Sequence, residues 1–147
     1  MRLRNWDVRL VHFQTEVLGA SFVWGETDCA SLVRRALEVM YSPDDIPLPP
    51  KLPRWTTEAG ALRAHKRFGG VSGALEAGGA QRASLAFVQQ GDVLVGLDPA
   101  GGVPGAAVVV QGGFLVASVE LGVLRRRLRD LRRAPPAELE VWRPPVE

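Results

Sequence analysis

The residue best suited to chemistry is Cys29, which is the only cysteine of the chain. It stands in the first turn of a predicted helix, directly after Thr27 and Asp28, either of which can cap that helix. A thiol at this place faces unpaired N–H groups and the positive end of the helix dipole, which favours the thiolate and makes the sulfur a better nucleophile. Cys29 is therefore a candidate catalytic nucleophile, and Asp28 is a second candidate site residue.

Nucleophilic catalysis also needs a base within hydrogen-bond reach, normally an imidazole, and a third group to orient it. The chain has two histidines. His12 lies on the side of its predicted helix away from the apolar stripe, and we expect it to face solvent. His65 shares a helical face with Ala61, Leu62 and Phe68, so it can be half-buried and reach another element. His65 is the candidate base.

The position of Cys29 also fits a thiol that only packs in the core. It shares a helical stripe with four apolar residues, and free cysteine is among the residue types most often buried. These four residues are Leu32, Val33, Ala36 and Met40. A single cysteine can form neither an intrachain disulfide nor a cysteine-based metal cluster, and the aspartates lack the spacing of a calcium loop. We therefore expect no metal and no cofactor.

The elements that position these residues fall into a helical first half and a strand-rich second half. Helical spacing, caps and glycine stops predict helices over about 6–18, 28–41, 58–67 and 72–77, with Asn5 and Ser72 among the caps. Five of the eleven prolines lie in 42–54, which predicts an ordered surface loop.

Short runs rich in valine and leucine, separated by turn residues, predict the strands of one antiparallel sheet. They cover 92–97, 106–110, 114–118, 123–128 and 139–142. Helices followed by strands indicate an α+β fold with the helices packed on one side of the sheet. At 147 residues the chain fits a single domain, 1–147.

Composition excludes several classes of protein. With 46% hydrophobic and 23% charged residues, the chain is neither disordered nor fibrous. It has no apolar run near the roughly 18–20 residues that cross a bilayer, and residues 1–5 lead into a polar segment instead of the apolar core of a signal peptide. We expect no membrane partner and no export.

A dense basic run of six arginines lies between 125 and 133, and we expect it on a strand edge. Such a run forms a solvated face, blunts edge-to-edge pairing or contacts an acidic protein. No stacking aromatic residues are interleaved with it, and the net charge of the chain is only +2, so nucleic acid is not the expected partner.

The segment 22–33 resembles the nucleophile motif of the NlpC/P60 cysteine peptidases, which is of the type Tyr-x-Trp-Gly-Gly-x-Asp-Cys-Ser-Gly-Leu-Val. The matching residues are Trp24, Gly25, Asp28, Cys29, Leu32 and Val33. The chain is more similar still to an offshoot of that family found among phage tail genes. That offshoot shares a Trp-Gly-x-x-Asp-Cys motif, a Gly-Asp-Val strand opening, here Gly91-Asp92-Val93, and a C-terminal tryptophan, here Trp142.

The chain departs from the peptidase pattern where the catalysis of that family lies. In that family a strand opens with the catalytic histidine, and the next strand carries a third polar residue. Here the first of these strands, 105–110, contains no histidine, and Ser118 is the only polar residue of the second. Phe22 replaces the motif tyrosine, Glu26 the second glycine, and Ala30-Ser31 the Ser-Gly pair.

The resemblance implies a papain-like NlpC/P60-type fold and a phage tail or tail-tip component with a degenerate peptidase site. Its partners would be other tail proteins, and it would be made in the bacterial cytoplasm and located in the virion tail. The alternative is an active cysteine peptidase or amidase that cleaves peptidoglycan peptides as the phage enters the cell. In that case Cys29 is the nucleophile, and His65 or a partner chain supplies the base. A nucleic-acid-binding module is the third interpretation.

Overall fold

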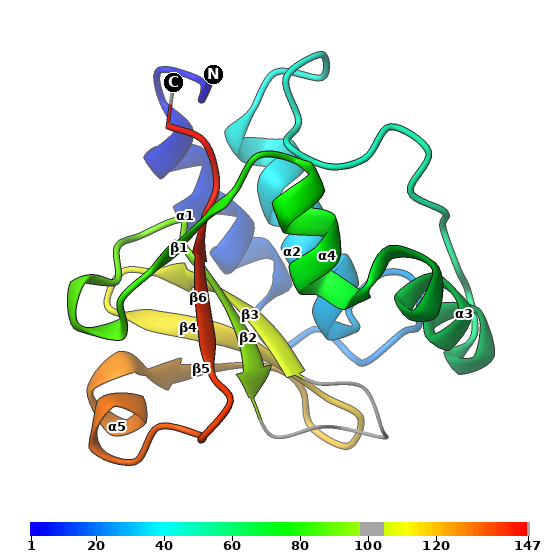
Figure 1. The fold of residues 1–147 in the computed structure, drawn as a ribbon. Coiled ribbons are helices and arrows are strands. Elements are labelled where there is room, and N and C mark those ends of the chain that lie inside the picture. Colours follow the sequence, from blue (N-terminus) through cyan, green and yellow to red (C-terminus); the bar gives the residue numbers. More distant parts are fainter. Residues whose placement is uncertain (98–104, 147) are drawn as a thin grey trace.

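In the computed structural model, which describes residues 1–97 and 105–146, helices come first and a sheet follows (Figure 1). The helices are α1 (Trp6–Val17), α2 (Cys29–Met40), α3 (Glu58–Phe68), α4 (Gly70–Ala77), the short 3-10 helix η1 (Leu85–Phe87) and α5 (Leu128–Arg133). The strands are β1 (Gln81–Ala83), β2 (Val93–Leu97), β3 (Gly105–Val110), β4 (Gly113–Ser118), β5 (Gly122–Arg127) and β6 (Glu140–Arg143). The fold is α+β, as predicted, and no described helix is both long and apolar enough to span a membrane.

Caps explain where two of the helices begin. The Asp28 side chain accepts a hydrogen bond from the backbone of the first turn of α2, and Thr57 does the same for α3. Asn5 precedes α1 but makes no such bond, so the predicted cap there is wrong. Helix α4 begins two residues before the predicted start, because Gly69 and Gly70 both adopt a positive φ and turn the chain directly out of α3.

The six strands form one antiparallel sheet in the order β1-β6-β2-β3-β4-β5. The C-terminal strand β6 lies between β1 and β2, whereas β2 to β5 follow one another in chain order. The five predicted strands are confirmed to within a residue or two. The three-residue β1 was not predicted, because it is too short to show an alternating pattern.

The sheet is buried on both faces. One face packs against α1, α2 and α4 and contains the larger core cluster, to which Val93 and Val108 belong. The other face holds a smaller cluster around Leu94 and Val109, completed by Leu128 of α5. The N-terminal helices thus lie on one side of the sheet, as predicted, whereas the short α5 on the other side was not predicted. Burial on both faces explains why β2 and β3 are continuous apolar runs instead of alternating ones.

The basic run lies only in part on a strand edge, as predicted for the whole of it. Its first part ends β5, but 128–133 form helix α5, which lies at the lower left of Figure 1. Leu128 and Leu131 are three residues apart, which is helical spacing, and both are buried against the sheet.

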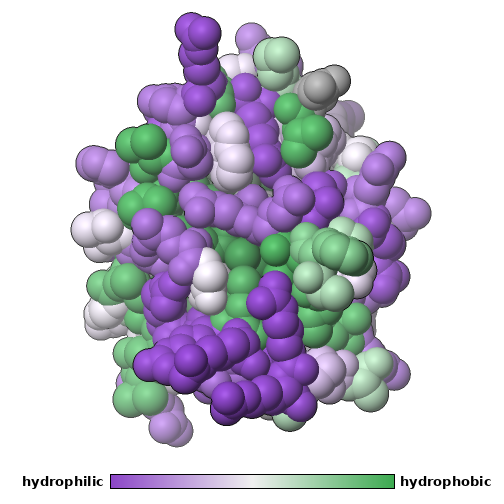
Figure 2. All heavy atoms as spheres, turned by 90° about the vertical axis from the view of Figure 1, so that its left-hand side faces the viewer, coloured by the Kyte–Doolittle hydropathy of each residue, from purple (hydrophilic) through white to green (hydrophobic). Residues whose placement is uncertain are grey.

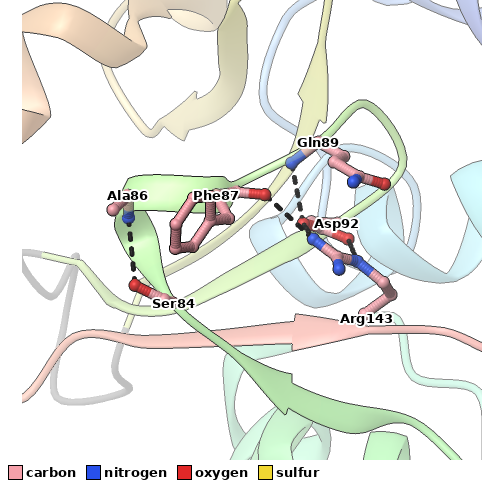
Figure 3. Close-up of polar contacts among 6 residues, drawn as sticks. All are labelled: Ser84, Ala86, Phe87, Gln89, Asp92 and Arg143. Atoms are coloured by element: carbon pink, nitrogen blue, oxygen red, sulfur yellow. Dashed lines mark hydrogen bonds and ion pairs between the residues drawn. The ribbon is translucent and has the colours of Figure 1, made fainter.

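A buried ion pair joins the start of β2 to the C-terminal strand. Asp92 is fully buried, and its carboxylate accepts two hydrogen bonds from the Arg143 guanidinium, at 3.0 and 2.9 Å, and one from the backbone of Gln89. Arg143 also donates to the carbonyl of Phe87 (Figure 3). Asp92 of the Gly-Asp-Val segment therefore fastens β6 and the 84–90 loop to the middle of the sheet.

Candidate functional site

The turn before α2 depends on one glycine. Gly25 has φ +86, and a Cβ atom built there would lie 2.0 Å from the backbone oxygen of Trp55. The turn therefore passes so close to the segment before α3 that a side chain at this position has no room. Because Gly25 has no side chain, the turn that contains Trp24, the segment that contains Trp55 and the start of α2 can lie close together.

Asp28 is the hub of this turn. It is buried, and one carboxylate oxygen accepts from the backbone of Ser31 at 3.0 Å. The other accepts from the Ser31 hydroxyl at 2.7 Å, the Gly25 amide at 2.6 Å and the Trp55 indole at 3.1 Å. Since protein donors occupy both oxygens, the carboxylate holds the turn, α2 and Trp55 in one arrangement. A role for Asp28 in a reaction remains a prediction.

Cys29 is the first residue of α2 and is partly buried at the wall of a pocket. Burial raises the pKa of its thiol, and the nearby charge of Asp28 adds to the increase, whereas a hydrogen bond from the backbone of Ala106 lowers it. The net effect is a pKa above the ordinary value of a thiol. Desolvation therefore outweighs the helix terminus, and the sulfur is a neutral thiol at neutral pH.

The strand beside the thiol carries no side chain that can take its proton. Ala106 of β3 is buried next to the sulfur, and Gly105 precedes it at the edge of the same pocket. On the next strand, Ser118 accepts a hydrogen bond from the backbone of Leu121 and so closes a turn. The hydroxyl oxygen of Ser118 therefore stabilises the turn between β4 and β5.

His65 lies near the end of α3 and lines the same pocket as Cys29. Its ring packs on the backbone of Gly70, where an added Cβ atom would lie 2.7 Å from Cε1. Among the described residues, no hydrogen bond joins His65 to Cys29. The structure therefore brings the candidate base and the candidate nucleophile to one pocket but does not pair them, and His12 is exposed elsewhere.

The pocket has a volume of about 130 Å³ and is mostly apolar. Four aromatic residues contribute to its lining, and Phe22 and Trp24 meet edge to face with ring centroids 4.8 Å apart. The four are Phe22, Trp24, Trp55 and Phe68. The proline-rich loop closes one side with Leu52, whose carbonyl accepts from Arg34. This loop is ordered by its contacts with α2, as predicted.

Sequence reasoning missed two residues of the site. Trp55 bonds to a carboxylate 27 positions away, and Ala106 contacts a thiol in a different half of the chain. Neither contact has a local sequence signal, because both arise from packing between distant segments.

The described residues contain no group of three histidine, cysteine, aspartate or glutamate side chains placed to hold a metal ion. In comparison with known families, a model described as a domain of unknown function (DUF6950) matches residues 1–134. No curated protein matches the chain.

Proposed function

The chain belongs to the DUF6950 family, and from this premise we propose that it is a phage tail or tail-tip component with a papain-like, NlpC/P60-type fold and a degenerate peptidase site. The sequence resemblance around Cys29 supports a role in the phage tail. One structural observation supports the loss of chemistry: the strand beside the thiol presents Ala106 to the sulfur where a peptidase of that type presents a histidine.

The arrangement of the elements is compatible with the proposed fold. The motif cysteine opens α2, α2 packs against β3, and β3 belongs to an antiparallel sheet. In the NlpC/P60 pattern the nucleophile and the histidine come from the same two kinds of element, a helix start and a neighbouring strand.

The chemistry available to this site is correspondingly poor. A thiol whose pKa is raised by burial attacks a carbonyl slowly at neutral pH, because the thiolate is the nucleophile. Protonation of a leaving amine also needs a general acid, and Ala106 offers only its backbone. The retained pocket and turn therefore serve the stability and shape of the domain.

The proposal is tested with tail particles assembled without this protein. Purified wild-type protein is added, and its incorporation into the particles is measured by sedimentation. We expect the wild type and Cys29→Ala to be incorporated equally, because assembly does not use the thiol. Particles that take up neither protein would contradict a role in the tail.

The alternative function is an active peptidase or amidase acting on the peptide part of peptidoglycan. It is favoured by the single observation that His65 and Cys29 line one pocket. It requires the histidine to leave its contact with Gly70 and reach the sulfur. Hydrolysis of peptidoglycan fragments that disappears in both Cys29→Ala and His65→Ala would establish it.

A further inference from the structure

The positive charge of the chain is concentrated in one short segment. Residues 125–133 contain six arginines and one aspartate, a net charge of +5, whereas the whole chain carries only +2. The rest of the chain is therefore net negative, at −3. A local excess of this size makes the segment a place where an anionic partner is attracted.

The register of β5 and the pitch of α5 direct four of these arginines to one hollow. Arg125 and Arg127 are two residues apart on a strand and so point to the same face. Arg129 and Arg132 are three apart on α5 and share a face of that helix. All four line one hollow of about 530 Å³, which has room for several side chains and not only for a single ion.

The exposed lining of this hollow is mostly polar, and aliphatic side chains supply its smaller apolar part. Val88, Val109 and Leu128 contribute to its lining. Figure 2 shows this side of the molecule, where hydrophilic residues gather along the lower edge and an apolar area lies directly above them. Phe87, next to Val88 in η1, is exposed over 74% of its surface. Arginine and aromatic residues are enriched in protein interfaces.

The arginines are held in place but are weakly neutralised within the described part of the chain. The Arg125 guanidinium lies across Gly113, where an added Cβ atom would be 2.6 Å from Cζ, and it donates to the carbonyl of Gln111. Arg129 has one acidic neighbour, Asp130, at 4.0 Å, and both side chains are largely exposed. Such an exposed pair contributes little and leaves the guanidinium available.

We propose that this arginine hollow docks an acidic segment of another protein, with aspartate or glutamate carboxylates on the guanidinium groups. Guanidinium groups bind carboxylates through two parallel hydrogen bonds. A protein fits better than a nucleic acid, because no aromatic ring lines the hollow itself and Phe87 is a single exposed ring next to it, whereas nucleic-acid sites combine basic residues with several stacking rings. The inference deepens the proposed assembly role and rests on it for the identity of the partner as a tail protein.

The test measures binding of a fluorescent synthetic peptide made of glutamate, aspartate and leucine to the full chain at low salt. The variant Arg129→Gln/Arg132→Gln removes two charges from the hollow. The matched control Arg126→Gln/Arg133→Gln removes two charges from the same run at exposed residues outside the lining. We expect the first pair to weaken binding by about tenfold or more and the control by less than about threefold.

A third variant, Arg129→Lys/Arg132→Lys, keeps the charge and is expected to weaken binding, because lysine lacks the two-pronged geometry. Equal weakening by the hollow pair and the control pair would overturn the proposal, since binding would then depend on total charge. Tighter binding of a DNA duplex than of the peptide would overturn it in favour of a nucleic acid. Peptide binding needs no tail particle, so intact binding without incorporation would contradict the proposed function alone.

Discussion

Ala106 of β3 and Cys29 at the first turn of α2 line the same pocket, and the backbone of Ala106 lowers the pKa of the thiol against the larger effect of burial. The start of a helix and the start of an interior strand thus meet at this pocket, where the strand contributes its backbone and a methyl group. Burial then raises the pKa of the thiol, and the turn around it is stabilised by Asp28. Five expected outcomes follow from this arrangement and from the ion pair between Asp92 and Arg143.

Asp28→Ala removes the cap of α2 and leaves the donors of Gly25, Ser31 and Trp55 without their acceptor. We expect the free energy of unfolding to fall by about 2–3 kcal/mol, since a lost cap and buried unpaired donors both contribute. Urea unfolding measures the change. Asp44→Ala, at an exposed position, is the control, and an equal small loss in both variants would contradict the hub role of Asp28.

Gly25→Ala tests the close approach of the turn to Trp55. Gly25 and Gly19 both have positive φ, at +86 and +81, but only Gly25 has a backbone oxygen within 4 Å of an added Cβ. We expect Gly19→Ala to cost about 1 kcal/mol of unfolding free energy from backbone strain alone, and Gly25→Ala at least about 1 kcal/mol more. Equal losses of unfolding free energy in the two variants would mean that the backbone near Trp55 shifts easily to admit the added methyl group, which would contradict the prediction.

Arg143→Met leaves the Asp92 carboxylate fully buried with only the Gln89 amide as a partner. Because an unpaired buried charge is costly, the free energy of unfolding is expected to fall by about 3 kcal/mol. The comparison is Arg54→Met, which breaks the exposed pair with Glu38 and is expected to cost less than about 1 kcal/mol. Equal losses of unfolding free energy in the two variants, measured by urea unfolding, would mean that the buried Asp92 carboxylate does not need Arg143 as its partner.

The local elements of the fold could be predicted from the sequence, and the contacts between distant segments could not. Asp28 and Thr57 are recognisable caps, and the apolar runs of β2 to β5 are recognisable strands. The helical spacing of Leu128 and Leu131 was present in the sequence but was hidden by the arginines around it.

In the candidate site, too, local features could be predicted from the sequence and contacts between distant segments could not. The placement of Cys29 at a helix start was predictable from the cap, whereas its pKa depends on burial by neighbours far along the chain. The helix dipole alone favours a thiolate, so local reasoning gave the wrong direction for the shift. The half-buried place of His65 followed from its helical face, but its stacking on Gly70 depends on the turn between α3 and α4.

The raised pKa of Cys29 has a consequence for stability at alkaline pH. The folded state holds the thiol proton more tightly than the unfolded state, so the stabilisation is complete below the ordinary thiol pKa of about 8.5 and is lost as the pH rises through the folded-state value. Between about pH 7 and about pH 10, the wild type is expected to lose more unfolding free energy than Cys29→Ala. Denaturant titrations at both pH values measure this difference. A larger loss of unfolding free energy in Cys29→Ala than in the wild type would mean that folding lowers the pKa of the Cys29 thiol instead of raising it.

The most direct test of the proposal that the peptidase site is degenerate is the rate of alkylation of Cys29 as a function of pH, with the urea-unfolded chain as the reference. No other thiol is present to obscure the reaction. We expect the folded protein to react more slowly than the unfolded chain, with a midpoint above the ordinary thiol pKa of about 8.5, and we expect His65→Ala to leave the rate unchanged. Rapid labelling that persists well below that pH and depends on His65 would contradict the account and indicate a working thiol hydrolase.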